Sequence, residues 1–210
     1  MIIKLCGMRR PEDIEYVNAE KPDFIGFILA EGYRRTISPE QAAKLAASLD
    51  MGIKPVGVFI DQPVEFLAEA AESIGLYAVQ LHGNEDGEYI SRLRGLTGAK
   101  IWKAARVRTA EDIEKADHCG ADMLVLDSFS PDANGGTGKT ADWDLIKSVK
   151  ISTPYLLAGG IDISNIQQAM EILPPGCGID VSSGIETGGV KDLNKIKAIM
   201  NIVRKVDENV

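Results

Sequence analysis

Two side chains that could transfer protons stand at the ends of strongly apolar segments. Cys6 closes the run IIKLC (2–6), and Asp127 follows directly after Leu124-Val125-Leu126. A carboxyl group at the end of a buried strand loses hydration, which raises its pKa and suits it to act as a general acid. A free cysteine has a pKa of about 8.5, so Cys6 would need help to act as a base. The alternatives are an aspartate that caps the next loop and a cysteine that packs in the core.

Small residues follow two other apolar segments in the C-terminal part of the chain. Glycine lets a backbone approach a phosphate closely, and serine hydroxyls add hydrogen-bond donors. On neighbouring strands, such loops favour a phosphate-binding site over two ordinary tight turns. The candidate substrate-binding residues are Gly159 and Gly160 in the first loop, with Asp180, Ser182, Ser183 and Gly184 in the second.

Several cationic groups lie close to these positions in the sequence. Arg9 and Arg10 come just after the candidate base and are candidates to tune its pKa. Arg34 and Arg35 belong to a long loop after the second apolar segment. Paired surface arginines are usually solvated, but one of these two could hold a carboxylate through two parallel hydrogen bonds. His82 is predicted to be structural or to line a pocket.

The segment ANGGTGKT (133–140) ends like the phosphate-binding loop of P-loop nucleotide-binding proteins. However, Ala133 stands where that loop has its first glycine, and the segment begins several residues after its strand. We therefore interpret it as a glycine-rich flap over the site, with Lys139 as a candidate cation for a phosphate or for the rim.

Short β-rich apolar segments position these residues, and a helical pattern follows each of them. The segments lack regular polar alternation, as expected when both faces of a parallel sheet are covered. The expected strands are 2–6, 23–29, 54–60, 77–81, 100–105, 122–127, 154–158 and 178–181. Capping oxygens, first-turn acids or prolines mark helix starts at 11–13, 38–40, 62–63, 84–85, 109–111, 142, 164 and 192.

These repeated units predict an α/β protein, a (β/α)8 TIM barrel formed as a single domain over residues 1–210, with an open doubly wound sheet as the alternative. An internal repeat favours two half-barrels. Without gaps, segment 4–28 matches segment 103–127 at 7 of 25 positions, including the whole of Glu-Asp-Ile-Glu. Because the active site of such a barrel lies at the C-terminal ends of its strands, the candidate residues are expected on one rim.

Composition excludes several classes of function. The 210 residues include 23 basic and 31 acidic side chains, a net charge of -8. This balance argues against nucleic acids and anionic membranes as partners, because both attract basic surfaces. Cys6, Cys119 and Cys177 lie far apart without metal-ligand spacing, so we expect neither disulfides nor a metal site. With no signal-peptide or membrane-spanning run, the expected location is cytoplasmic.

Several segments together resemble the phosphoribosylanthranilate isomerase family of tryptophan biosynthesis. They cover essentially the whole chain in that family's order: KLCG, VGVF, VQLHG, Leu126-Asp127, GGTGKT followed by DW, LAGG and DVSSGIE. Leu5 in place of isoleucine and the basic run Met8-Arg9-Arg10 are minor departures.

The resemblance implies an Amadori rearrangement of N-(5-phosphoribosyl)anthranilate to 1-(2-carboxyphenylamino)-1-deoxyribulose 5-phosphate. By position, Cys6 matches the family's general base, Asp127 its general acid, and Arg35 the arginine near the anthranilate carboxylate. The loops 159–160 and 182–184 match its phosphate-binding segments. No cofactor is expected, because an iminium intermediate itself accepts the electrons. The expected partner is a small phosphosugar, and the expected state is a monomer or weak homodimer.

Three other functions stay open at this point. The histidine-pathway aminoaldose isomerase carries out the same rearrangement, but it has an aspartate where Cys6 stands and binds a substrate with two phosphates. A P-loop nucleotide-binding protein built around 133–140 is the second alternative. The third is a barrel that binds phosphosugars without catalysis.

Overall fold

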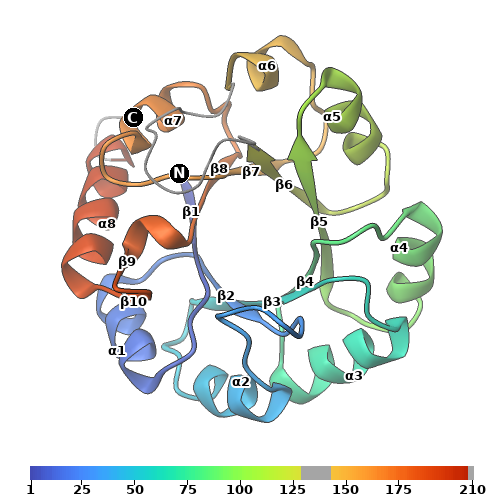
Figure 1. Ribbon diagram of the computed structural model, residues 1–210, viewed down its shortest axis with the longest axis horizontal. Helices are drawn as coiled ribbons and strands as arrows, with labels where there is room; N and C mark the ends of the chain where they lie inside the picture. The colour runs from blue at the N-terminus through green and yellow to red at the C-terminus, as the bar shows by residue number, and fades with distance from the viewer. Residues whose placement is uncertain (129–142, 208–210) are drawn as a thin grey trace.

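Eight parallel strands close into a barrel in the computed structural model, which describes residues 1–128 and 143–207. Each strand pairs with the next, and the last strand closes the ring by pairing with residues 2–5 of the first. Figure 1 looks down this barrel. The predicted (β/α)8 fold is confirmed, and every predicted strand is present. The strands are β1 (Ile2–Cys6), β2 (Phe24–Ile28), β3 (Lys54–Phe59), β4 (Ala78–Leu81), β5 (Lys100–Val107), β6 (Met123–Ser128), β7 (Tyr155–Ala158) and β8 (Gly178–Val181).

Helices surround the barrel and alternate with the strands along the chain (Figure 1). The last helix packs beside the first, so the outer layer closes as the sheet does. The helices are α1 (Pro11–Glu20), α2 (Pro39–Ala46), α3 (Val64–Ile74), α4 (Gly87–Arg94), α5 (Ala110–Asp117), α6 (Trp143–Ser148), α7 (Ile166–Glu171) and α8 (Leu193–Asp207).

Helix α4 begins later than predicted, because the acid expected in its first turn is used elsewhere. Glu85 is buried, its carboxylate accepts a hydrogen bond from the amide of Asp61 at 2.8 Å, and it pairs with Lys103 Nζ at 2.9 Å. The helix starts instead at Gly87, where the Asp86 side chain caps the first turn.

Helix α7 also begins two residues beyond its predicted start. The amide and the hydroxyl of Ser164 both donate to Oδ1 of Asp162, at 2.8 and 2.5 Å. This local loop keeps Ser164 outside the helix, and Asn165 becomes the residue that precedes Ile166.

The barrel interior changes from apolar to polar along its axis. Strand side chains alternate between the interior and the helix-covered outside. Phe24 and Trp102 pack edge to face inside the barrel, with ring centroids 4.9 Å apart. Lys4 and Asp180 face one another across the pairing of β1 with β8, where Lys4 pairs with Phe24 on its other side. The interior therefore has an apolar base below a layer of ionisable groups.

A short hairpin follows the last strand of the barrel. After β8 the chain forms the 3-10 turn η1 (Ser183–Ile185) and the strands β9 (Glu186–Thr187) and β10 (Val190–Lys191). Arg9 and Arg10 donate to carbonyl groups of this hairpin at 3.1 and 3.2 Å. The hairpin thus contacts the loop between β1 and α1. Of the helices in the described ranges, none is both long enough and apolar enough to cross a membrane.

The internal repeat has a structural counterpart at two helix starts. Asp13 accepts hydrogen bonds from the amides of Arg9 and Arg10, and Asp112 accepts them from the amides of Arg108 and Thr109. The same sequence element therefore builds the same turn after β1 and after β5.

Candidate active site

A buried lysine lies at the centre of the polar layer. Lys4 and Cys6 are two residues apart on β1, so both side chains point into the barrel. Lys4 is fully buried, and its Nζ lies 2.8 Å from Oδ2 of Asp180. Burial alone lowers the pKa of Lys4, but the charges of Asp180 and Cys6 outweigh this effect and raise it. Lys4 therefore stays charged and joins two of the predicted site residues.

The thiol of Cys6 occupies a space that a glycine leaves open. A Cβ atom added to Gly26 on β2 would lie 2.6 Å from Sγ of Cys6 and 3.2 Å from Nζ of Lys4. Burial raises the pKa of the Cys6 thiol, Lys4 and Lys191 oppose the rise, and Asp180 adds to it. The thiol is thus protonated in the unliganded protein, and the two lysines are the groups that would stabilise a thiolate.

Asp127 lies across the barrel from Cys6. Strands β7 and β8 separate β6 from β1 on one side, and the remaining strands separate them on the other. Burial raises the pKa of Asp127, His82 and Arg106 act against the rise, and Asp180 adds to it. The net shift is upward, which is the direction that the sequence predicts.

His82 makes a contact with Asp127 that the sequence did not indicate. Its Nε2 lies 3.9 Å from Oδ2 of Asp127. On the other side of the ring, the side-chain amide of Gln80 lies 3.2 Å from Nδ1. Burial lowers the pKa of His82 and the charge of Asp127 opposes this, with a net downward shift, so the ring is mainly neutral at pH 7.

Arg35 is held by a carboxylate of the hairpin after β8. Its Nε and Nη2 donate to the two oxygens of Glu186 at 2.6 and 3.0 Å. Arg34 and Lys191 donate to the same carboxylate at 2.8 and 2.9 Å. Burial disfavours the charged carboxylate, but these hydrogen bonds outweigh it and lower the pKa of Glu186 to about 2. Three cations around one anion leave this cluster positively charged.

The two glycine-rich loops lie side by side, as the sequence predicts for neighbouring strands. A Cβ atom on Gly184 would collide with the carbonyl oxygen of Ile161, so the turn after β8 packs directly on the loop after β7. Gly159 and Gly160 adopt φ values of 93° and 65°, which favour glycine. Within the described ranges, neither of their amides donates a hydrogen bond. Ser182 donates its hydroxyl to the carbonyl oxygen of Cys6 at 3.3 Å.

The arginines after Cys6 have partners other than the thiol. Arg10 forms an ion pair with Asp13 at 2.7 Å, and Arg9 donates to backbone carbonyls of Arg34 and Gly189. The cations beside the thiol are lysines instead. A period-two pattern along β1 would have indicated Lys4, whereas Lys191 and Glu186 have no comparable signal in the sequence.

The glycine-rich segment 133–140 lies outside the described residues, together with Lys139 and the helix start predicted at Asp142. Its interpretation as a flap therefore stays a prediction.

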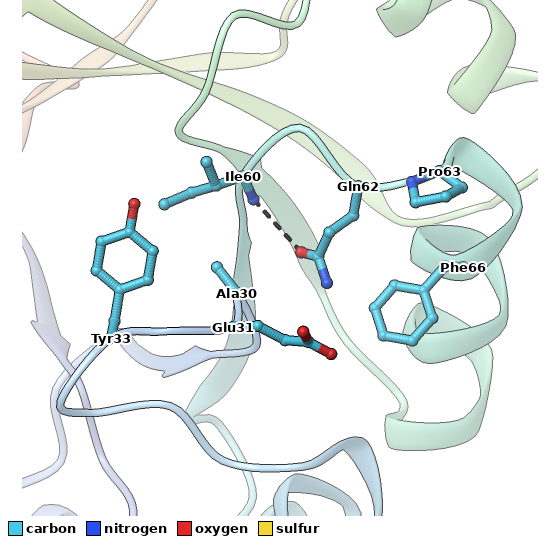
Figure 2. A pocket seen from close by; sticks show the side chains of 7 residues that line it. All are labelled: Ala30, Glu31, Tyr33, Ile60, Gln62, Pro63 and Phe66. Carbon is cyan, nitrogen blue, oxygen red and sulfur yellow. Dashed lines mark hydrogen bonds between the residues drawn. The ribbon is translucent and has the colours of Figure 1, made fainter.

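A cavity of about 480 Å³ opens on the same rim, between the loops after β2 and β3. Figure 2 shows Tyr33 on one side of it and Phe66 on the other, with the amide of Ile60 donating to Gln62. None of the predicted site residues lines this cavity. The loop after β2 thus contributes Tyr33 to this cavity and Arg35 to the contact with the hairpin.

The fold and the rim define a class of protein, the (β/α)8-barrel enzymes, with titratable groups and glycine-rich loops at the C-terminal ends of the strands. Comparison with known proteins gives the family. A family model described as N-(5'-phosphoribosyl)anthranilate (PRA) isomerase matches residues 3–202. The chain belongs to this family.

Individual relatives agree with this assignment. The chain is 43% identical over 205 residues to N-(5'-phosphoribosyl)anthranilate isomerase of Clostridium acetobutylicum, covering 97% of this chain and 98% of the relative. The crystal structure of phosphoribosyl anthranilate isomerase from Thermotoga maritima matches with a TM-score of 0.86 and 31% identity, covering 98% and 100% of the two chains. A further isomerase structure, in complex with reduced 1-(o-carboxyphenylamino)-1-deoxyribulose 5-phosphate, has a TM-score of 0.83 and 29% identity over 98% of this chain and all of the other.

Proposed function

We propose that this isomerase of tryptophan biosynthesis converts N-(5-phosphoribosyl)anthranilate into 1-(2-carboxyphenylamino)-1-deoxyribulose 5-phosphate, with Asp127 as general acid and Cys6 as general base. The observation that carries the proposal is the placement of these two groups on opposite walls at one end of the barrel. A sugar between them can receive a proton on one side and lose another on the other.

The first step requires an acid. Asp127 donates a proton to the furanose ring oxygen, the bond between that oxygen and C1 breaks, and the nitrogen lone pair forms an iminium ion. A carboxyl group performs this step only while it is protonated, and burial raises the pKa of Asp127 toward that state. The ring of His82 faces this carboxyl group, with Nε2 3.9 Å from Oδ2.

The second step requires a base. The Cys6 thiolate removes the proton from C2, the C–H electrons form the enolamine, and the iminium accepts them. The enolamine then becomes the ketone as C1 takes up a proton and the hydroxyl on C2 loses one. Lys4 and Lys191 favour the thiolate, which opposes the effect of burial.

The remaining predicted residues bind the substrate. The loops 159–160 and 182–184 hold the phosphate with backbone amides and serine hydroxyls, and Arg35 faces the anthranilate carboxylate. Oδ1 of Asp180 is buried without a hydrogen-bond partner among the described residues, so it is an acceptor for a sugar hydroxyl. We also propose a cytoplasmic location and a monomer or weak homodimer.

Turnover of the fluorescent anthranilate substrate tests this function. Asp127→Asn keeps the size of the side chain but cannot deliver a proton, so turnover should fall about 10²- to 10⁴-fold. The wild-type pH profile should have two limbs, and the variant should keep only the limb that depends on deprotonation of Cys6. Asp144→Asn, an exposed aspartate on α6, is the matched control and should behave as wild type. Normal turnover of Asp127→Asn with an unchanged profile would contradict the assignment.

A further inference from the structure

Arg35 is bound in a way that leaves half of its guanidinium group available. A guanidinium has two edges that suit a carboxylate: the side formed by Nε and Nη2, and the end formed by Nη1 and Nη2. Glu186 occupies the side edge, with bonds of 2.6 and 3.0 Å. Within the described ranges, Nη1 of Arg35 donates to no group. The end edge can therefore donate hydrogen bonds to a second carboxylate while Glu186 stays in place.

The stem of Arg35 is also fixed, and it is fixed beside the thiol. A Cβ atom on Gly7, the residue after Cys6, would lie 2.7 Å from Cδ of Arg35. Gly7 has a φ of 86°, a conformation that favours glycine. Arg35 thus crosses the chain immediately after β1, which places its guanidinium on the rim next to the candidate base.

Glu186 is itself held firmly, so it can orient another side chain. Only 6% of its side chain is exposed, and its two oxygens accept four hydrogen bonds from Arg34, Arg35 and Lys191. Lys191 also donates to the carbonyl oxygen of Ser182 at 3.0 Å. The carboxylate is thereby tied to the loop that is proposed to bind the phosphate.

We propose that Glu186 is a positioning residue, which holds Arg35 by its side edge and presents the end edge to the carboxylate of the substrate. This inference rests on the proposed function and adds the residue that sets the distance between the carboxylate and phosphate subsites. Because Glu186 joins the hairpin after β8 to the loop after β2, it fixes that distance across strand β1, which lies between β8 and β2. Ligands with a carboxylate ortho to the amine gain from it, and ligands without the carboxylate do not.

Binding of two ligands, measured by calorimetry, tests the proposal. The first is reduced 1-(o-carboxyphenylamino)-1-deoxyribulose 5-phosphate, and the second is the same molecule without the carboxylate. Glu186→Gln keeps the size of the side chain but removes its charge, so Arg35 loses its orientation. Binding of the first ligand should weaken about 10- to 100-fold, as expected for lost charge-assisted hydrogen bonds, and binding of the second should change less than about twofold.

Two controls separate positioning from folding. Glu20→Gln removes a second little-exposed glutamate that pairs with an arginine, Arg204, at 3.0 Å, where α1 meets α8, and it should alter neither affinity. In an Arg35→Ala background, Glu186→Gln should no longer change the preference for the carboxylate ligand.

In turnover, Glu186→Gln should raise KM and leave kcat nearly unchanged, because the carboxylate is bound equally in substrate and transition state. Glu186→Asp should recover part of the affinity.

Three results would overturn the proposal. Equal weakening of both ligands would mean that Glu186 only maintains the fold of the hairpin. Tighter binding of the carboxylate ligand to Glu186→Gln would mean that Glu186 competes with the substrate for Arg35. An unchanged effect of Glu186→Gln in the Arg35→Ala background would mean that Glu186 acts through another group. Failure of the proposed function is a different outcome, because the wild-type protein would then bind neither ligand.

Discussion

Replacing Lys4 with methionine keeps a long side chain in the barrel interior but removes the positive charge beside Asp180. The two groups lie 2.8 Å apart with 0% and 8% of their side chains exposed, so water cannot replace the lost partner. Breaking a buried ion pair in this way typically costs about 3–5 kcal/mol. The carboxyl group can escape part of that cost by taking up a proton, which for an aspartate of ordinary pKa costs about 4 kcal/mol at pH 7 and about 1.5 kcal/mol at pH 5.

The destabilisation of Lys4→Met should therefore be about 3–4 kcal/mol at pH 7 and should shrink as the pH falls. The sign follows from the variant alone. The raised pKa of Lys4 keeps the wild-type lysine charged in both the folded and unfolded states between pH 5 and 7, whereas the unpaired carboxyl group binds a proton on folding. For a domain of this size, the melting temperature should fall by about 6–16 °C at pH 7.

Urea unfolding, followed by the fluorescence of the two buried tryptophans Trp102 and Trp143, measures the loss at both pH values. The double variant Lys4→Met/Asp180→Asn is the control, and it should recover most of the stability because no charge is left without a partner. A loss below about 1 kcal/mol at pH 7, or an equal loss at pH 5 and 7, would refute the reasoning, since the carboxylate would then have found water or another cation.

Three further predictions concern the rim and its ligands. Cys6→Ser should keep the fold and the product affinity but lower turnover about 10²- to 10⁴-fold in steady-state assays, because an alcohol is far harder to deprotonate than a thiol. Near-normal turnover would mean that Cys6 only packs in the barrel interior. Gly26→Ala should displace Sγ of Cys6 and lower kcat about 100-fold with little change in product binding, and an unchanged kcat would count against this placement of the thiol. Product at 100 times its Kd should raise the melting temperature by about 5–11 °C, and Gly160→Asp, where a Cβ meets open space, should remove most of that rise; equal protection of both proteins would exclude the proposed phosphate loop.

The sequence predicted the barrel because its signals are local. Apolar segments, capping residues and prolines act within a few residues, and they placed every strand and most helix starts close to where they lie. Where a helix start was wrong, as at Glu85, a side chain had a distant partner in Lys103. No local pattern reports such a partner.

The candidate site was predictable for a related reason. Cys6 and Asp127 were predicted on one rim because the strand ends of a barrel meet there. Lys4 was overlooked, although its spacing of two residues from Cys6 was a usable signal. The bond between Arg35 and Glu186 joins residues 151 positions apart, and only the closed barrel brings them together.

The burial of Lys4 also has a consequence for the order in which the chain is made. Lys4 emerges from the ribosome 176 residues before its partner Asp180. The edge of β1 that pairs with β8 therefore has no partner strand until β8 has been synthesised. A lysine on an open edge keeps that edge hydrated and resists pairing with the edges of other nascent chains. Once β8 pairs with β1, Asp180 neutralises the charge of Lys4. The same side chain then belongs to a buried ion pair of the closed barrel.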